Sequence, residues 1–201
     1  MDRREFLARW EADPYLNRAE LIEGVVYLAS PVSISHGCYD NPLHVWLGYY
    51  RSRSSGCQIL GNTTWMLLDS SPQPDLALRR LPEAGGLSGN TEDGKYPVGP
   101  PELVVEVCRS SRSYDLGPKL ALYRRAGVPE YLALLVEERR VEWRVLEGDR
   151  YVLLAADRDG FLKSRIFPGL WLDPAALFAE DLPAMIAAVE RGLENEKRAG
   201  G

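Results

Sequence analysis

Residues 101–108 read Pro-Glu-Leu-Val-Val-Glu-Val-Cys, and this stretch decides the fold. Its side chains alternate between two apolar faces, with Leu103, Val105 and Val107 on one and Val104 and Cys108 on the other. Such a pattern is typical of a strand that is covered on both sides. Glu106 interrupts it. An ionised carboxylate is costly to bury alone, so the sequence predicts a cation beside Glu106: a metal, a lysine or an arginine.

Two other charged residues are candidates to meet Glu106. Asp75 follows Pro74 at the start of a strand predicted near 75–80, where proline restricts the backbone. Lys119 lies on the apolar stripe of a helix predicted from about Asp115 to Ala126, with Asp115 as its N-cap. Two carboxylates and a lysine beside an α/β sheet suit a hard-metal site that cleaves phosphodiesters.

Each of these residues also has a purely structural interpretation. Asp75 could serve a turn, and Glu106 could belong to a structural salt bridge. Lys119 could snorkel, with its stem packed and its ammonium in water, or it could reach the buried glutamate. The sequence leaves both alternatives open for the lysine.

The remaining pattern predicts a mixed α/β sheet flanked by helices, with an N-terminal helix and hairpin, in one domain spanning 1–201. The hairpin covers 19–28 and turns at Glu23-Gly24, and a helix is predicted to begin at Asn41-Pro42. Further strands are predicted near 57–60, 64–69, 130–137, 141–146 and 151–156. A short helix capped by Asp173-Pro174 is predicted to run to Phe178, and a last helix is predicted over 183–197. The Gly- and Pro-rich residues 81–100 are expected to form a flexible loop, and the tail 197–201 is expected to fray.

Composition limits the function only loosely. The net charge of −5 argues weakly against a nucleic-acid partner, because net charge says little about a local groove. The three cysteines, Cys38, Cys57 and Cys108, are too widely spaced for a zinc pattern. No apolar run approaches the ~20 residues of a membrane span, so we expect no membrane association and a cytoplasmic location.

Several segments together resemble a known family. They are Glu20-Leu-Ile-Glu-Gly24, Ser30-Pro31 with His36, Pro74-Asp75, Pro101-Glu-Leu-Val-Val-Glu-Val107, Asp115-Leu-Gly-Pro-Lys119 and Tyr123-Arg-Arg-Ala-Gly-Val-Pro-Glu-Tyr131. Their order over about residues 15–180 is similar to that of the putative restriction endonuclease family of the PD-(D/E)XK nuclease superfamily. The resemblance implies a restriction-endonuclease-like core, a divalent cation (Mg²⁺ or Mn²⁺) and DNA as substrate.

The resemblance also assigns residues. Asp75 and Glu106 correspond to the two acids that hold the metal, and Lys119 corresponds to the catalytic lysine, whose usual position is taken here by Cys108. Glu20, Glu23 and His36 match accessory family positions, with His36 expected in a loop before the second helix. Cleavage of both DNA strands would favour a homodimer with one site per strand.

The chain departs from the family pattern in three places. Pro118 stands where a glutamate is common, Arg109 stands where a serine is common in a segment one residue short, and Pro42 interrupts a usually longer helix. These departures, with the negative net charge, motivate the alternative of a non-catalytic DNA-binding or regulatory module on the same fold. A weaker alternative is an unrelated small-molecule enzyme that uses the same acids.

Overall fold

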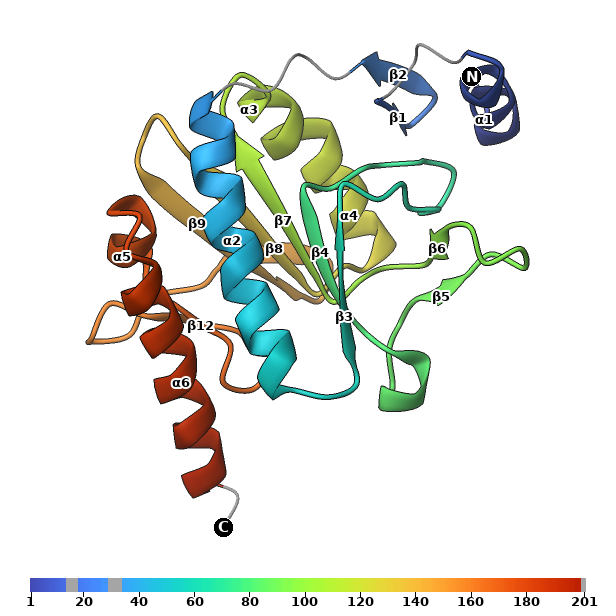
Figure 1. Cartoon of the computed structure of the whole chain (residues 1–201). Helices are drawn as coiled ribbons and strands as arrows, with labels where there is room; N and C mark the ends of the chain where they lie inside the picture. Colours follow the sequence, from blue (N-terminus) through green and yellow to red (C-terminus); the bar gives the residue numbers. More distant parts are fainter. Residues whose placement is uncertain (14–17, 29–33, 200–201) are drawn as a thin grey trace.

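A six-stranded mixed sheet forms the centre of the protein in the computed structural model, which describes residues 1–13, 18–28 and 34–199 (Figure 1). Its strand order is β10-β9-β8-β7-β4-β3. The strands are β3 (Cys57–Gly61), β4 (Leu76–Arg80), β7 (Leu103–Cys108), β8 (Glu130–Leu135), β9 (Arg140–Glu147) and β10 (Arg150–Leu153). Only β7 and β8 pair in parallel within this sheet. A parallel pair needs a crossover, which the helical residues between these strands supply.

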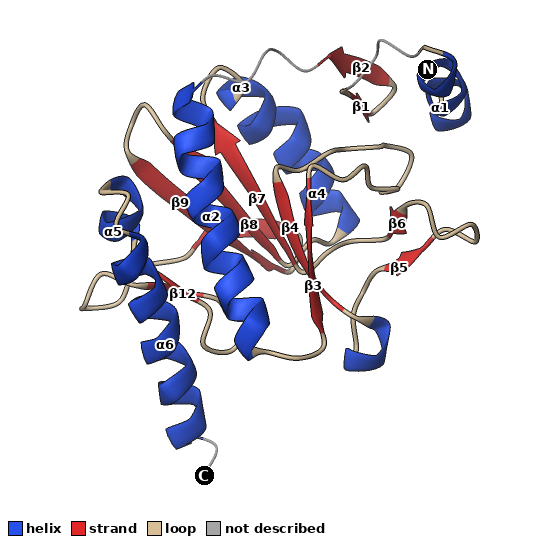
Figure 2. Ribbon diagram, in the orientation of Figure 1, coloured by secondary structure: helices blue, strands red, loops and turns tan. Residues whose placement is uncertain are grey.

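Helices cover both faces of the sheet, as the apolar strand pattern predicts (Figure 2). On one face, α2 (Ile34–Arg53) packs over Leu103, Val105 and Val107, and α6 (Leu182–Ala199) packs against α2 in the same core cluster. On the other face, α4 (Leu120–Ala126) packs over Val104 and Cys108. All six residues of β7 are buried, which confirms the predicted central strand. No helix in the described ranges has both the length and the apolar character needed to cross a membrane.

The N-terminal helix and hairpin are present as predicted. Helix α1 (Arg3–Ala12) has Asp2 as its N-cap, whose carboxylate accepts from the Glu5 N–H at 2.8 Å. Strands β1 (Ala19–Ile22) and β2 (Val25–Leu28) pair around a turn at Glu23 and Gly24. Reciprocal backbone hydrogen bonds of 3.2 and 2.7 Å between Leu21 and Ser71 connect β1 to the segment before β4.

Two predicted helix starts are wrong. Helix α2 begins at Ile34 and continues through Pro42, so His36 has a helical backbone position and is not in a loop. Buried Tyr39 before the proline and Trp46 after it belong to the same core cluster, and this packing outweighs the loss of one backbone donor at Pro42.

The helix after β7 also begins earlier than predicted. Helix α3 (Arg112–Tyr114) leads without interruption into the π-helical turn η2 (Asp115–Lys119) and then α4. Asp115 is therefore not an N-cap: it is a buried helical residue, only 3% exposed.

The C-terminal part follows the sequence closely. Asp173 caps α5 (Pro174–Phe178) by accepting from the Ala175 and Ala176 N–H groups. Helix α6 extends to Ala199, and 200–201 lie outside the described residues, so the expected fraying of the tail stays a prediction. The positive charges of Lys197 and Arg198 in the last turn of α6 interact favourably with the negative end of the helix dipole. A short pair, β11 (Leu162–Lys163) and β12 (Trp171–Leu172), precedes α5.

Two predicted segments between β3 and β7 differ from expectation in form. Residues 64–69 make isolated bridges and no named strand. Residues 81–100 contain the 3-10 turn η1 (Pro82–Ala84) and a short hairpin of β5 (Gly89–Asn90) and β6 (Pro97–Val98). Glu102 accepts from the Leu87 N–H at 2.8 Å, and Arg79 donates to the Gly89 carbonyl at 2.9 Å, so the base of the hairpin is attached to the sheet.

We predict that the hairpin tip, residues 91–96, behaves as a mobile flap. Its residues are mostly exposed and make few contacts with the core. Amide hydrogen exchange should be fast across the tip and slow in β7. Strong protection of residues 91–96 would contradict this prediction.

Candidate active site

A buried ion pair between Glu106 and Lys119 lies at the centre of the candidate site. The Lys119 Nζ atom is 2.6 Å from Glu106 Oε1, and each side chain is only 3% exposed. Glu106 comes from the middle of β7, and Lys119 comes from the end of η2. The lysine therefore does not snorkel to solvent, and the alternative in which it reaches the glutamate is the one observed.

The π-helical turn brings Lys119 to this position. Pro118 lies inside the turn and has no N–H to donate, so the regular α-helical ladder cannot run through it. The helix widens locally, as often happens in π-bulges, and Lys119 faces the sheet. Its ammonium also donates to the Gln73 carbonyl at 3.4 Å and lies 3.9 Å from Asp115 Oδ1.

Glu20 reaches the same lysine from the N-terminal hairpin. Its Oε1 atom is 3.1 Å from Lys119 Nζ and also accepts from the Gln73 N–H at 2.6 Å. Its Oε2 atom accepts from the Tyr114 hydroxyl at 3.1 Å. Both oxygens of Glu20 thus have donors, and Glu20 is a second carboxylate beside the Lys119 ammonium.

Asp75 lies beside Glu106 across the β4–β7 pair. Leu76 pairs with Val105, so the preceding residue, Asp75, falls opposite Glu106. Asp75 Oδ2 accepts from the Val107 N–H at 2.8 Å, and the Asp75 N–H lies 3.4 Å from Glu106 Oε2. The structure therefore brings Asp75, Glu106, Lys119 and Glu20 together.

Negative charge exceeds positive charge in this cluster. Burial raises the pKa of Glu106, an effect that Lys119 opposes and that Asp115, Asp75 and Glu20 reinforce. Burial alone lowers the pKa of Lys119, but the Glu106 and Glu20 carboxylates outweigh it and raise that pKa above its usual range. Burial likewise raises the pKa of Asp115. Lys119 is therefore an ammonium, and the surplus of acids favours a further cation or a retained proton.

The sequence did not single out three residues that hold this cluster together. Tyr123 donates to Glu106 Oε1 at 3.1 Å, Tyr114 donates to Glu20, and Gln73 contacts both Glu20 and Lys119. A signal existed for Tyr123, which follows Lys119 by four residues on a buried helix face. A buried tyrosine hydroxyl requires a partner.

Of the other two predicted accessory residues, one lies outside this cluster and the side chain of the other is not described. Glu23 lies at the hairpin turn, has a side chain 47% exposed and forms its ion pair with Arg125 of α4. The side chain of His36 lies outside the described part of the structure.

The donor atoms fit a hard divalent cation. Among the described residues, no three histidine, cysteine, aspartate or glutamate side chains are arranged as a set that could hold a metal ion. Mg²⁺, however, usually takes one or two carboxylates and completes its shell with water and substrate oxygens. Asp75 and Glu106 provide such a pair.

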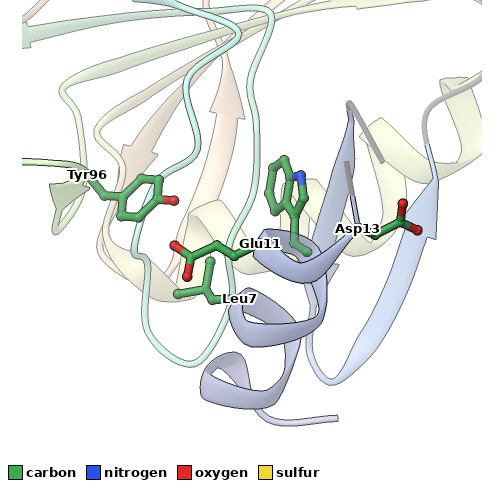
Figure 3. Close-up of a pocket in the computed structure, with 5 residues that line it drawn as sticks. Leu7, Glu11, Asp13 and Tyr96 are labelled. Atoms are coloured by element: carbon green, nitrogen blue, oxygen red, sulfur yellow. The ribbon is translucent and has the colours of Figure 1, made fainter. Parts of the chain in front are cut away.

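A separate pocket lies between α1 and the hairpin tip (Figure 3). Its lining residues are Leu7, Trp10, Glu11, Asp13 and Tyr96. Glu11 forms an ion pair with Lys95, whose ammonium lies 5.1 Å from the Tyr96 ring centroid. None of these residues belongs to the Lys119 cluster, so this pocket is distinct from the candidate active site.

Comparisons with known proteins agree with the fold and the motifs. The model of the Uma2 family, described as putative restriction endonuclease, matches residues 4–175. The fold is similar to the crystal structure of a putative nuclease belonging to DUF820 from Anabaena variabilis ATCC 29413. That likeness has a TM-score of 0.71 at 15% sequence identity and covers 89% of this chain and 98% of that chain. No curated protein matches. The chain belongs to the putative restriction endonuclease family.

Proposed function

We propose that this protein is a metal-dependent DNA endonuclease that hydrolyses phosphodiester bonds in the cytoplasm. The observation that carries the proposal is the buried Lys119 ammonium 2.6 Å from Glu106, with Asp75 beside that glutamate. An uncompensated acidic cluster is poorly suited to stabilise a fold and well suited to bind a cation. Asp75 and Glu106 would hold Mg²⁺ or Mn²⁺.

The residues would have different roles in the proposed hydrolysis. A bound divalent cation would polarise the phosphate and lower the pKa of a water. Lys119 would orient that water or neutralise charge that develops on the phosphate. Glu20 would keep Lys119 aimed at the site, while His36 and Glu23 remain proposed accessory residues. Two copies of the chain would place one site on each strand of duplex DNA, so we propose a homodimer.

A second candidate is a non-catalytic DNA-binding or regulatory module. The observation in its favour is that Lys119 is already paired with Glu106 and Glu20, which could make the cluster purely structural. Buried ion pairs of this kind occur without any catalytic role.

DNA cleavage separates the two candidates. With Mg²⁺ or Mn²⁺ the parent protein should nick or linearise a supercoiled plasmid, and chelation should abolish the reaction. Glu106→Gln should lower the rate ~10²-fold or more, because it removes a carboxylate that holds the cation. Glu142→Gln is the matched control, since Glu142 is also buried and ion-paired, with Arg140 and Arg144 of its own strand.

The control should cleave like the parent if it remains folded. A parent that binds DNA but cleaves none under varied cation and pH would favour the binding module. Gel electrophoresis and a DNA-binding titration on the same samples distinguish the outcomes.

A further inference from the structure

The two carboxylate oxygens of Glu106 have unequal surroundings. Oε1 receives the Lys119 ammonium at 2.6 Å and the Tyr123 hydroxyl at 3.1 Å. Oε2 faces the Asp75 N–H at 3.4 Å, a long contact for a hydrogen bond. One oxygen therefore has two strong donors, and the other is turned toward Asp75 with little to hold it.

Tyr123 is well placed to maintain this difference. It lies in α4 one turn after Lys119, so both side chains approach Glu106 from the same helix face. Its ring is 1% exposed and packs against Tyr131 with ring centroids 5.6 Å apart, which fixes the hydroxyl. Burial raises the pKa of Tyr123 well above its usual value, so the hydroxyl stays protonated and donates.

Glu20 shows the contrast. The Lys119 ammonium and the Gln73 N–H contact its Oε1 at 3.1 and 2.6 Å, and the Tyr114 hydroxyl contacts its Oε2 at 3.1 Å, so each oxygen of Glu20 has a close donor. Among the oxygens of these two glutamates, Glu106 Oε2 has the longest and weakest contact, and it lies on the Asp75 side.

We infer that Tyr123 is a positioning residue that, with Lys119, occupies Glu106 Oε1 and directs Oε2 toward a divalent cation shared with Asp75. The inference rests on the proposed function. Turning the carboxylate away would break both contacts to Oε1, so Tyr123 keeps the cation-binding oxygen in place before the cation arrives. Partners that orient a metal ligand in this way typically raise metal affinity ~10–100-fold.

Two phenylalanine variants test this inference. Tyr123→Phe removes the hydroxyl that contacts Glu106 and keeps the ring. Tyr131→Phe is the control, because that ring is equally buried but its hydroxyl donates to the Asp115 carbonyl at 3.0 Å. Mn²⁺ binding to the full chain is measured by electron paramagnetic resonance titration, and folding is checked by circular dichroism.

The expected result is that Tyr123→Phe weakens Mn²⁺ binding ~10-fold or more while Tyr131→Phe changes it little. Equal Mn²⁺ affinity in the parent and Tyr123→Phe would overturn the inference and leave the proposed function standing. An equal loss in both variants would overturn it too, because the effect would then come from removing any buried tyrosine hydroxyl near the site and not from the contact between Tyr123 and Glu106. A parent that binds no Mn²⁺ would overturn both the inference and the proposed function.

Discussion

Lys119→Met should lower the rate of DNA cleavage ~10²-fold or more and should weaken Mn²⁺ binding much less than that. The carboxylates hold the cation in our account, while the ammonium acts on the attacking water or the phosphate. Removing the Lys119 charge makes the acidic cluster more negative, so its electrostatic attraction for a divalent cation is not reduced. Single-turnover cleavage and a parallel Mn²⁺ titration measure the two effects separately. A variant that cleaves as fast as the parent would reduce Lys119 to a structural ion pair.

The same substitution should also destabilise the fold. From the sequence alone, a charged residue on an apolar helix face predicts little change in stability. The structure leads us to expect a loss of stability instead, because Lys119 is buried and its removal leaves the buried Glu106 carboxylate without its cation. Breaking such a pair typically costs ~3–5 kcal/mol.

A double variant separates the stability effect from the catalytic one. Lys119→Met with Glu106→Gln removes both charges, so most of the lost unfolding free energy should return while cleavage remains at least as slow as in either single variant. Denaturant unfolding near neutral pH measures the free energies. If the double variant is no more stable than Lys119→Met alone, uncompensated charge is not the cause of the loss.

Removing either proposed metal-binding acid should strongly weaken cation binding. Glu106→Gln retains an oxygen for Tyr123 and Lys119 but loses the negative charge beside Asp75. Asp75→Asn keeps the shape of the aspartate side chain and removes its negative charge. Because a hard divalent cation here depends on only two carboxylates, we expect each variant to lose Mn²⁺ binding by ~10²-fold or more in calorimetry.

Glu142→Gln again provides the control, since its carboxylate pairs only with arginines of β9 in the described contacts. Binding that survives in Glu106→Gln and Asp75→Asn would show that the cation lies elsewhere. Equal loss in the control would point to a general effect of removing buried charge.

The sequence was sufficient where one local pattern had one physical solution. Two apolar faces around Glu106 predicted the central strand, and β7 confirms it. The helical stripe placed Lys119 on the buried side of its helix. Whether its ammonium reaches water or Glu106 could be decided only from the distance between Lys119 Nζ and Glu106 Oε1 in the structure. Asp173 before Pro174 predicted a cap that is present, because a cap depends on a few neighbouring residues.

The sequence was insufficient where tertiary packing overrode a local signal. Asn41-Pro42 is a typical helix start, but α2 continues through Pro42 because residues before and after the proline pack in the same core. Asp115 has the form of a cap, but the helix begins at Arg112. Glu20 is linked to Lys119 only by the way the hairpin folds back toward the sheet, and no spacing in the chain reveals that contact.

The most direct test of the central claim is anomalous diffraction from crystals soaked in Mn²⁺. Our account predicts one strong peak between the Asp75 and Glu106 carboxylates, on the Oε2 side of Glu106, with the Lys119 ammonium remaining at Oε1. A peak at another site, or no peak at a concentration that supports DNA cleavage, would contradict it.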